Sequence, residues 1–352
     1  MIASPLAQFR VRLHAWWEGV DPAQLVHPAP AMAQDAPALV LSEPAQPHHL
    51  EEPQPEGGEE LLIEQQRLIP AEAEADDEPD YEPPIPLSPR MAALRYLWGG
   101  WRIAPQEPKL LNGVLASLKL PPRDPVCFVG PGGMSPVIGL AKLHSGPLEV
   151  CEWREEAFAP MHAAAGAIED RMIMVGPMGL DGRGLPRGLA ALISLEELAY
   201  VPDLDGYINA VLGGLRGDGR AVLEGYCSTD GALEVAPCFS TSFAQPMLRT
   251  RETVRLALAL SGAVIEHEED RTREHVHAAR SAFRRFSRNL AERRNQLPPG
   301  GAQELMAEAE SWQARMNCLS EGKIRRMRFV IRKRKPKTFK PPPKKKEWRR
   351  GK

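Results

Sequence analysis

The sequence has few cysteines and few aromatic residues. Its five cysteines, at positions 127, 151, 227, 238 and 318, form no CxxC pair, and aromatic residues make up 6% of the 352-residue chain. Cys127, Cys151 and Cys227 fall in apolar runs, where a free cysteine packs as a small hydrophobe. This usage argues against a disulfide framework and a zinc site, and it predicts a reducing, cytoplasmic environment.

Long apolar runs are also missing. No stretch approaches the ~20 consecutive apolar residues that a membrane-spanning helix needs. Arg10 and Arg12 interrupt the N-terminal segment where a signal peptide would have its apolar core. The sequence therefore predicts a cytoplasmic protein, and a position peripheral to the inner membrane stays open because the basic end of the chain suits an anionic surface.

Charge is nearly balanced over the whole chain but unevenly distributed. Residues 43–82 hold fourteen Asp or Glu and one Arg, whereas residues 323–352 hold sixteen Lys or Arg and one Glu. Blocks of like charge are typical of interaction segments. The basic end predicts contact with an anionic membrane or with nucleic acid, and pairing between the two charged arms is the alternative.

Composition divides the chain into four parts. Residues 1–25 carry apolar side chains at helical spacing and predict an amphipathic helix, which either docks on the body or lies at a membrane surface. Residues 26–90, rich in Pro, Ala and Glu, predict a disordered acidic linker. Residues 333–352 are rich in Lys, Arg and Pro and predict a disordered basic tail. Residues 91–332 are left for the folded domain.

Strand-length and helix-length segments alternate through this domain. Strands are expected at residues 126–129, 148–151, 171–175, 189–194, 220–226, 263–268 and 326–332. The alternation predicts an α/β fold with a Rossmann-like, mostly parallel, seven-stranded sheet and helices on both faces. Ligands are then expected at the edge where the loops after the strands lie. A helix over residues 204–215 is expected to stop at Gly217, Asp218 and Gly219.

The clearest local motif joins the first strand to a helix. The run at residues 126–129 leads into a glycine loop (residues 130–133) that contains Gly130, Gly132 and Gly133. Glycines let the backbone approach a ligand closely, and the N–H groups at a helix start suit an anionic or polar group. Glu152 closes the second strand, where its carboxylate can accept hydrogen bonds from a ribose diol. The motif predicts a nucleotide-binding unit; a turn that simply needs positive φ is the alternative.

Taken in order, these pieces resemble a class I S-adenosylmethionine-dependent methyltransferase over roughly residues 91–332. The resemblance rests on residues 126–133, on Glu152, on residues 192–203 after the fourth strand and on residues 212–220 before the fifth. It implies S-adenosylmethionine as the cofactor. The cofactor-binding residues that it implies are Gly130, Gly132, Gly133, Glu152, Met178 and Ser194.

An entry segment (residues 97–105, Leu-Trp-Gly-Gly-Trp-Arg-Ile-Ala-Pro) is similar to one subgroup of that superfamily. In phosphoethanolamine N-methyltransferase-like and cyclopropane-synthase-like enzymes, such a segment closes over the cofactor and an amine substrate. The resemblance implies catalytic roles for Trp101 and for Tyr200, which stands where the phosphoethanolamine enzymes carry a histidine. It also implies methyl transfer to a small-molecule or lipid-head-group substrate.

The chain departs from the family's pattern at several positions. Phe128 and Val129 stand where the loop usually follows an acidic residue, residues 176–178 stand where an acidic residue usually reads the adenine amine, and Gly100 replaces another acid. Each such lost contact removes ~1.5–3 kcal/mol of binding. The alternative is therefore a catalytically degenerate methyltransferase fold that serves as a binding or scaffold module at a membrane or nucleic-acid surface.

No metal site is predicted from the histidines. His275 and His277 are two residues apart and would not share a helix face, so together with His267 they predict a solvated helix start. Ser228 and Ser240 lack a GxSxG context, so no hydrolase nucleophile is predicted.

Overall fold

The structure, a computed structural model, describes residues 83–106, 109–166, 168, 172–230, 247–289 and 297–334. The chain divides into two compact units, residues 1–78 and 79–352, and every described residue belongs to the second. The predicted amphipathic helix at residues 1–25 lies outside the described residues. So do residues 26–82 of the predicted linker and residues 335–352 of the predicted tail.

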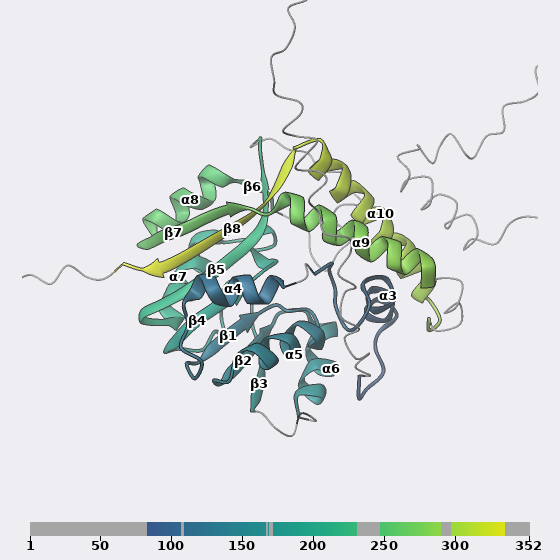
Figure 1. The fold of residues 1–352 in the computed structure, drawn as a ribbon, viewed down its shortest axis with the longest axis horizontal. Helices are drawn as coiled ribbons and strands as arrows, with labels where there is room; N and C mark the ends of the chain where they lie inside the picture. Colours follow the sequence, from purple (N-terminus) through teal and green to yellow (C-terminus); the bar gives the residue numbers. More distant parts are fainter. Residues whose placement is uncertain are drawn as a thin grey trace, which may run out of the picture. The chain divides into compact units, whose positions relative to one another are not determined.

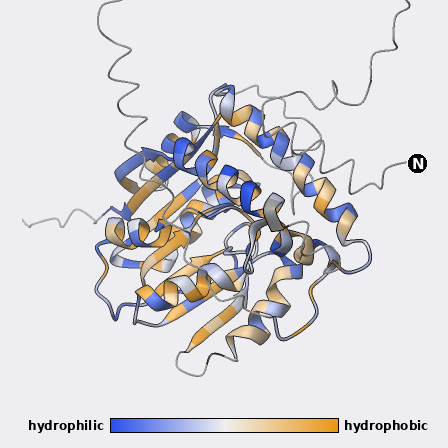
Figure 2. Cartoon of the chain, turned by 45° about the vertical axis from the view of Figure 1, so that its right-hand side comes forward, coloured by the Kyte–Doolittle hydropathy of each residue, from blue (hydrophilic) through white to orange (hydrophobic). Residues whose placement is uncertain are grey.

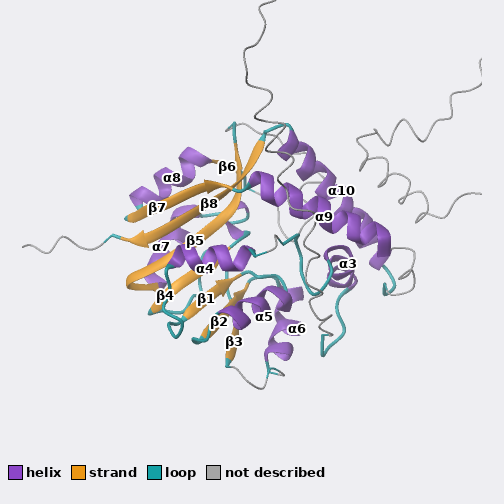
Figure 3. Cartoon of the chain, viewed as in Figure 1, coloured by secondary structure: helices purple, strands orange, loops and turns teal. Residues whose placement is uncertain are grey.

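An eight-stranded sheet runs through the described unit (Figures 1 and 3). Its strands are β1 (Val126–Val129), β2 (Leu148–Glu152), β3 (Ile173–Pro177), β4 (Leu189–Ser194), β5 (Leu215–Ser228), β6 (Arg249–Thr250), β7 (Ala263–Asp270) and β8 (Ile324–Lys333). The order is β3-β2-β1-β4-β5-β8-β7, with the short β6 beside β5. Strand β8 pairs antiparallel with β5 and β7, whereas the pairs among β1 to β5 are parallel. The predicted Rossmann-like α/β fold is confirmed.

Two of the described helices precede β1, and the others lie between strands in chain order. The helices are α3 (Pro89–Trp98), α4 (Leu110–Leu118), α5 (Met134–Leu143), α6 (Glu155–Ala165), η2 (Glu197–Ala199), α7 (Leu204–Gly214), α8 (Arg251–Leu260), α9 (Thr272–Asn289) and α10 (Gly301–Ser320). The chain moves one way across the sheet from β1 to β3 and the other way from β4 to β5. Since parallel crossovers are right-handed, α5 and α6 cover one face and α7 the other. Hydrophobic colour is concentrated on the central strands in Figure 2, and β1 and β4 are buried throughout.

A separate helical layer forms beside the carboxyl ends of the strands. Helix α3 packs against α9 and α10. Trp98 of α3 meets Phe283 of α9 and Trp312 of α10, with ring centroids 5.2 and 4.7 Å apart in edge-to-face arrangements that suit aromatic rings. This layer lies beside the sheet edge where ligands were expected, and α10 contributes residues to a cavity there.

The described unit starts before the predicted boundary at residue 91. Pro89 stands in the first turn of α3, and the Ser88 hydroxyl accepts a hydrogen bond from the Met91 N–H at 3.2 Å. Proline in the first turn and serine at the N-cap are strong start signals, because proline has no backbone N–H to leave unpaired and the serine hydroxyl accepts a hydrogen bond from a first-turn N–H. At the other end, β8 runs one residue past 332.

The predicted helix over residues 204–215 matches α7, which ends at Gly214, but the break expected at Gly217, Asp218 and Gly219 is absent. Strand β5 begins at Leu215, directly after α7, and continues through these residues. Leu189 of β4 pairs with Leu215, whereas Ala191 pairs with Arg220, so the extra residues of β5 form a bulge within the ladder. Within the described part of the chain, no helix is long and apolar enough to cross a membrane.

Candidate functional site at the carboxyl edge of the sheet

The glycine loop turns tightly at the end of β1. Gly130 and Gly132 have φ of +56° and +70°, a region that residues with a Cβ rarely adopt. Gly133 is extended, with φ 174°, and precedes the first turn of α5. The two left-handed positions therefore need glycine for backbone reasons alone, whether or not a ligand approaches them.

The carboxylate of Glu152 faces this loop. Glu152 ends β2 and is 1% exposed. Its Oε2 accepts a hydrogen bond from the Gly132 N–H at 2.8 Å, and its Oε1 accepts from the N–H groups of Trp153 and Arg154 at 3.0 and 2.9 Å. The predicted juxtaposition of loop and carboxylate is present, and the polypeptide's own donors hold the carboxylate in place.

A guanidinium group lies between the carboxylate and the loop. Arg154 is buried, and its Nη1 donates to Glu152 Oε1 at 2.9 Å and to the Gly130 carbonyl at 3.1 Å. Its Nη2 lies 3.8 Å from Glu197 Oε1, and its guanidinium carbon lies 4.2 Å from the centroid of the Trp153 ring. Two carboxylates, a carbonyl and an indole face thus surround one cation, a combination in which each partner stabilises the charge.

Glu197 covers Gly130 from the other side. It is fully buried in η2, and its Oε2 accepts hydrogen bonds from the Ser194 hydroxyl at 2.7 Å and the Glu196 N–H at 3.2 Å. Burial raises the pKa of Glu197 to about 7, although Arg154 and the Ser194 hydroxyl act in the opposite direction. A Cβ built on Gly130 would lie 1.7 Å from Glu197 Oε1, so the carboxylate occupies the space that the glycine leaves.

The entry segment covers the remaining two glycines. A Cβ on Gly132 would lie 2.2 Å from Cγ1 of Ile103, and one on Gly133 would lie 2.2 Å from the carbonyl oxygen of Trp101. The Trp101 N–H donates to the Ser135 hydroxyl at 2.7 Å, and the Ser135 N–H donates back to the Trp101 carbonyl at 3.3 Å. This reciprocal pair fastens the entry segment to the first turn of α5.

In this conformation the chain itself fills the Cβ side of all three glycines. The backbone geometry suits a close approach by a ligand, but atoms of Glu197, Ile103 and Trp101 occupy the approach to each of the three glycines. Oε1 of Glu152 already accepts from three donors, two of them on Arg154. The residue types match a nucleotide site; the chain itself fills the Cβ side of the glycines, and one of the cavities described below borders Gly130.

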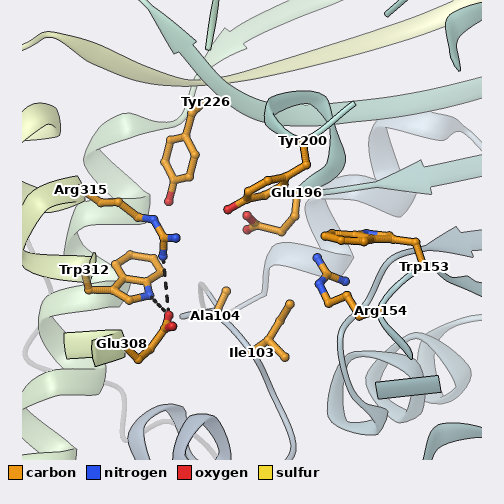
Figure 4. A pocket seen from close by; sticks show the side chains of 10 residues that line it. All are labelled: Ile103, Ala104, Trp153, Arg154, Glu196, Tyr200, Tyr226, Glu308, Trp312 and Arg315. Carbon is orange, nitrogen blue, oxygen red and sulfur yellow. Dashed lines mark hydrogen bonds and ion pairs between the residues drawn. The ribbon is translucent and has the colours of Figure 1, made fainter. Parts of the chain in front are cut away.

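Two cavities flank the entry segment. The first has a volume of about 360 Å³, part of it open to solvent, and is drawn in Figure 4. It is lined by Ile103, Ala104, Trp153, Arg154, Glu196, Tyr200, Tyr226, Glu308, Trp312 and Arg315. The second, of about 530 Å³ and likewise open, is bounded by residues 102–106 and by Phe128, Gly130, Glu196, Glu224, His275 and Arg326, among others.

Helix α10 supplies one wall of the first cavity. The Trp312 Nε1–H donates to Glu308 Oε1 at 2.8 Å, and Arg315 Nη1 lies 3.6 Å from the same oxygen. Burial raises the pKa of Glu308, and Arg315 acts against that rise. In Figure 4 the side chains of Arg315 and Trp312 point from α10 toward the rings on the sheet side.

The opposite wall carries two tyrosines. Figure 4 shows the hydroxyl ends of Tyr200 and Tyr226 pointing into the space near Arg315. The Tyr226 hydroxyl and His275 Nε2 share a hydrogen bond of 2.7 Å. His275 is 3% exposed, so the expectation of a solvated helix start is wrong at this position; the ring lies on the inner side of α9. Burial, with Arg326 and Arg315 nearby, lowers its pKa well below the ordinary value.

Strand β8 places two more arginines beneath the edge. Arg326 donates to Glu224 at 2.8 Å and to Glu196 at 2.7 Å, and Arg328 donates to Glu224 at 2.6 Å. All but Glu196 are buried. Burial opposes ionisation of Glu224, yet the two arginines hold its pKa below the ordinary value. The pairing keeps these charges inside the protein and fixes Glu196 at the cavity wall.

The predicted site residues separate into three groups. Around the loop lie Gly130, Gly132, Gly133 and Glu152. Tyr200 lines the first cavity, whereas Trp101 is buried on Gly133 and lines neither cavity. Ser194 is buried below Glu197, and Met178 packs in the core, so neither lines either of these two cavities. Among the described residues, no group of three or more His, Cys, Asp or Glu could hold a metal ion.

Sequence reasoning missed the residues that fill the site. Arg154 and Glu197 stand two and three residues after strands β2 and β4, at the positions where loops reach the ligand edge. A charged residue there is a usable signal. Glu308 and Arg315 on α10 gave no such signal, because they reach the edge only through the packing of α10 against α3 and the sheet.

Solved structures of methyltransferases have a fold similar to that of this chain. Phosphoethanolamine N-methyltransferase 2 of Haemonchus contortus, in complex with S-adenosyl-L-methionine, superposes with a TM-score of 0.59 at 13% identity, over 69% of this chain and 56% of that one. A putative sarcosine dimethylglycine methyltransferase of Galdieria sulphuraria superposes with a TM-score of 0.55 at 13% identity, over 70% and 99%. The fold is that of the class I methyltransferases. No protein-family model and no curated protein matches the sequence.

Proteins with this fold do not all catalyse the same reaction. The [4+2]-cyclase SpnF also superposes, with a TM-score of 0.53 at 15% identity, over 72% of this chain and 99% of that one. The chain spans a little over half the length of the Haemonchus enzyme. Similar folds thus carry different reactions, so the function of this chain has to be argued from its site.

Proposed function

We propose that this protein binds S-adenosylmethionine and transfers its methyl group to a small-molecule or lipid-head-group acceptor. The observation that carries the proposal is the hydrogen bond of 2.8 Å from the Gly132 N–H to Glu152 Oε2. It sets a glycine loop and a carboxylate side by side at the carboxyl ends of β1 and β2, the ligand edge of such a sheet. Structures of similar fold with S-adenosylmethionine or S-adenosylhomocysteine bound support the choice of cofactor.

Binding would require the site to open. The Arg154 guanidinium and the Ile103 side chain occupy the space next to the loop, so both would have to leave it. Gly99 and Gly100, with φ of +73° and +55°, lie in the entry segment directly after α3 and are the residues whose backbone can most easily change. When bound, the cofactor would supply the methyl group; the residues available to hold it are the glycine loop and Glu152.

The first cavity is then the proposed acceptor site. Its rings, from Trp153, Tyr200, Tyr226 and Trp312, suit a cationic amine such as a lipid head group carries, and an amine bound as the ammonium would lose a proton to solvent before it accepts the methyl group. The carboxylates of Glu196 and Glu308 on its walls favour the same charge. Arg154 and Arg315 oppose it, and both are paired with carboxylates, which reduces their repulsion.

A second candidate function follows from the filled loop. A fold in which Glu197, Ile103 and Trp101 cover all three glycines is also what a non-catalytic binding or scaffold module would have. In that case the ligand space would be the two open cavities beside the entry segment, and not the Cβ side of the glycine loop.

Calorimetric titration of the full chain with S-adenosylmethionine and S-adenosylhomocysteine separates the two. The methyltransferase proposal expects saturable heat that is lost in Glu152→Gln and retained in Asp181→Asn, a change of an exposed carboxylate beside Arg183. Circular dichroism would confirm that each variant is folded. No heat at millimolar cofactor on folded wild-type protein would leave only the second candidate.

A further inference from the structure

The space next to the glycine loop has the chemistry of a cation site. Its polar walls are acceptors: Glu152 Oε1, the Gly130 carbonyl and Glu197 Oε1, and an indole face closes one side. Cations bind best where carboxylates, carbonyl oxygens and aromatic faces converge away from water. Two carboxylates face a single guanidinium here, so with both ionised the acceptors outnumber the bound charge.

We propose that these groups form a binding site for an organic cation, and that Arg154 occupies it in the free chain. The ligand class is a guanidinium, ammonium or sulfonium group. The existence of the site stands on the contacts of Arg154 alone. Competition between Arg154 and S-adenosylmethionine, which carries a sulfonium and an ammonium group, rests in addition on the proposed function.

The side chain of Arg154 can leave the site without any change in the position of its backbone. Arg154 is the N-cap of α6, and its carbonyl accepts from the N–H groups of Ala157 and Phe158, both at 3.0 Å. The backbone therefore stays anchored whatever the side chain does. The long stem ends beside the first cavity, which Arg154 also lines and which is partly open to solvent (Figure 4).

Chemical rescue tests the site without any cofactor. In Arg154→Ala, Glu152 and Glu197 lose their cation, so the variant should melt below wild type. Millimolar methylguanidinium should bind the vacated space and raise the melting temperature saturably, as a ligand selective for the folded state does. Sodium chloride at equal ionic strength should not. Arg183→Ala removes a guanidinium whose side chain is 87% exposed and that pairs with Asp181, and it should show no methylguanidinium effect.

The outcome is decisive whether or not the alanine variant folds. If Arg154→Ala is unfolded, Arg154→Met keeps the apolar stem over Trp153 and serves in the same titration. A rise in melting temperature with methylguanidinium in either variant, absent in Arg183→Ala, supports the cation site. No rise beyond that of sodium chloride in either variant overturns it.

A second arm separates this inference from the proposed function. Calorimetry should find that Arg154→Ala binds S-adenosylmethionine at least tenfold more tightly than wild type, because the competing cation is gone. If methylguanidinium stabilises the variant but neither protein binds S-adenosylmethionine, the cation site is supported and the proposed function is contradicted. If wild type and Arg154→Ala bind S-adenosylmethionine equally tightly, the proposed function is supported and competition between Arg154 and the cofactor is contradicted.

Discussion

The two halves of the ligand edge differ in how they are filled. Against the loop after β1, Arg154, Glu197 and Ile103 occupy the space that glycines leave open. Between β5 and α10, aromatic rings and a paired Arg315 surround a cavity of about 360 Å³ that is partly open to solvent. The same sheet edge is thus closed by charge pairing on one half and lined by rings on the other. The difference teaches that an intact loop and carboxylate do not by themselves make a vacant site.

The largest expected effect is on the closed half. Gly130→Ala should destabilise the protein by about 4 kcal/mol, because it combines a left-handed backbone with a Cβ 1.7 Å from Glu197 Oε1. Urea denaturation measures the change. Gly113→Ala, in helix α4 with nothing within 4 Å of the added Cβ, is the matched control and should be neutral or slightly stabilising.

A double variant sharpens that result. Glu197→Ala should relieve part of the cost of Gly130→Ala, because it removes the atom that the new Cβ would meet. Additive effects of the two substitutions would contradict the close packing of Glu197 on the loop.

The next largest expected effect is a pH dependence of protein stability that is caused by Glu197, beside the glycine loop. Because burial raises the pKa of Glu197 to about 7 from an ordinary 4.5, the folded state binds more protons between these values than the unfolded state. Stability from this group is therefore full below pH 4.5 and is lost as pH rises toward 7. The free energy of unfolding that this group contributes at low pH, and that is lost above pH 7, is about 3 kcal/mol.

Glu197→Gln should remove this dependence. The variant should be more stable than wild type at pH 8 and close to it at pH 4.5, by urea denaturation at both values. Glu321→Gln, at an exposed carboxylate paired with Lys323, controls for the general effect of charge. An equal difference between Glu197→Gln and wild type at both pH values would contradict the buried proton.

A smaller effect is expected on the open half. Tyr226→Phe removes the partner of the buried His275 and should cost about 1–2 kcal/mol, measured by thermal or urea unfolding. Tyr200→Phe is the control, because no hydrogen bond of its hydroxyl is found among the described residues, and it should stay within ~0.5 kcal/mol of wild type. Equal losses in the two variants would show that the hydrogen bond to His275 contributes nothing specific.

The smallest effect concerns the two charged arms. Deletion of residues 43–82 should strengthen binding of the chain to anionic vesicles or DNA at low salt, because the acidic arm no longer competes for the basic tail. Vesicle co-sedimentation and DNA fluorescence anisotropy measure it, with the same titrations at high salt as the control. Unchanged binding at low salt would reject pairing between the arms.

Local sequence predicted the sheet well where an apolar run ends in a strong signal. The predicted segments 126–129 and 189–194 coincide with β1 and β4, since glycine or proline stands at or near their ends. The expected break at Gly217 is absent, because β5 pairs with β4 through this region and the register of that pairing shifts. No local sequence signal predicts such a shift. The prediction also failed at His275, whose burial depends on α9 packing over β8 and on the distant Tyr226.

The sequence by itself determined the order of strands and helices, the glycine loop and the carboxylate that follows β2, because periodicity and glycine act over a few residues. Only the tertiary structure decided that Arg154 turns inward, that Glu197 and Ile103 cover the loop, and that α10 closes the far wall. These outcomes depend on contacts between residues far apart in the chain, where the cost of burying a charge is set by the partners that the fold brings to it.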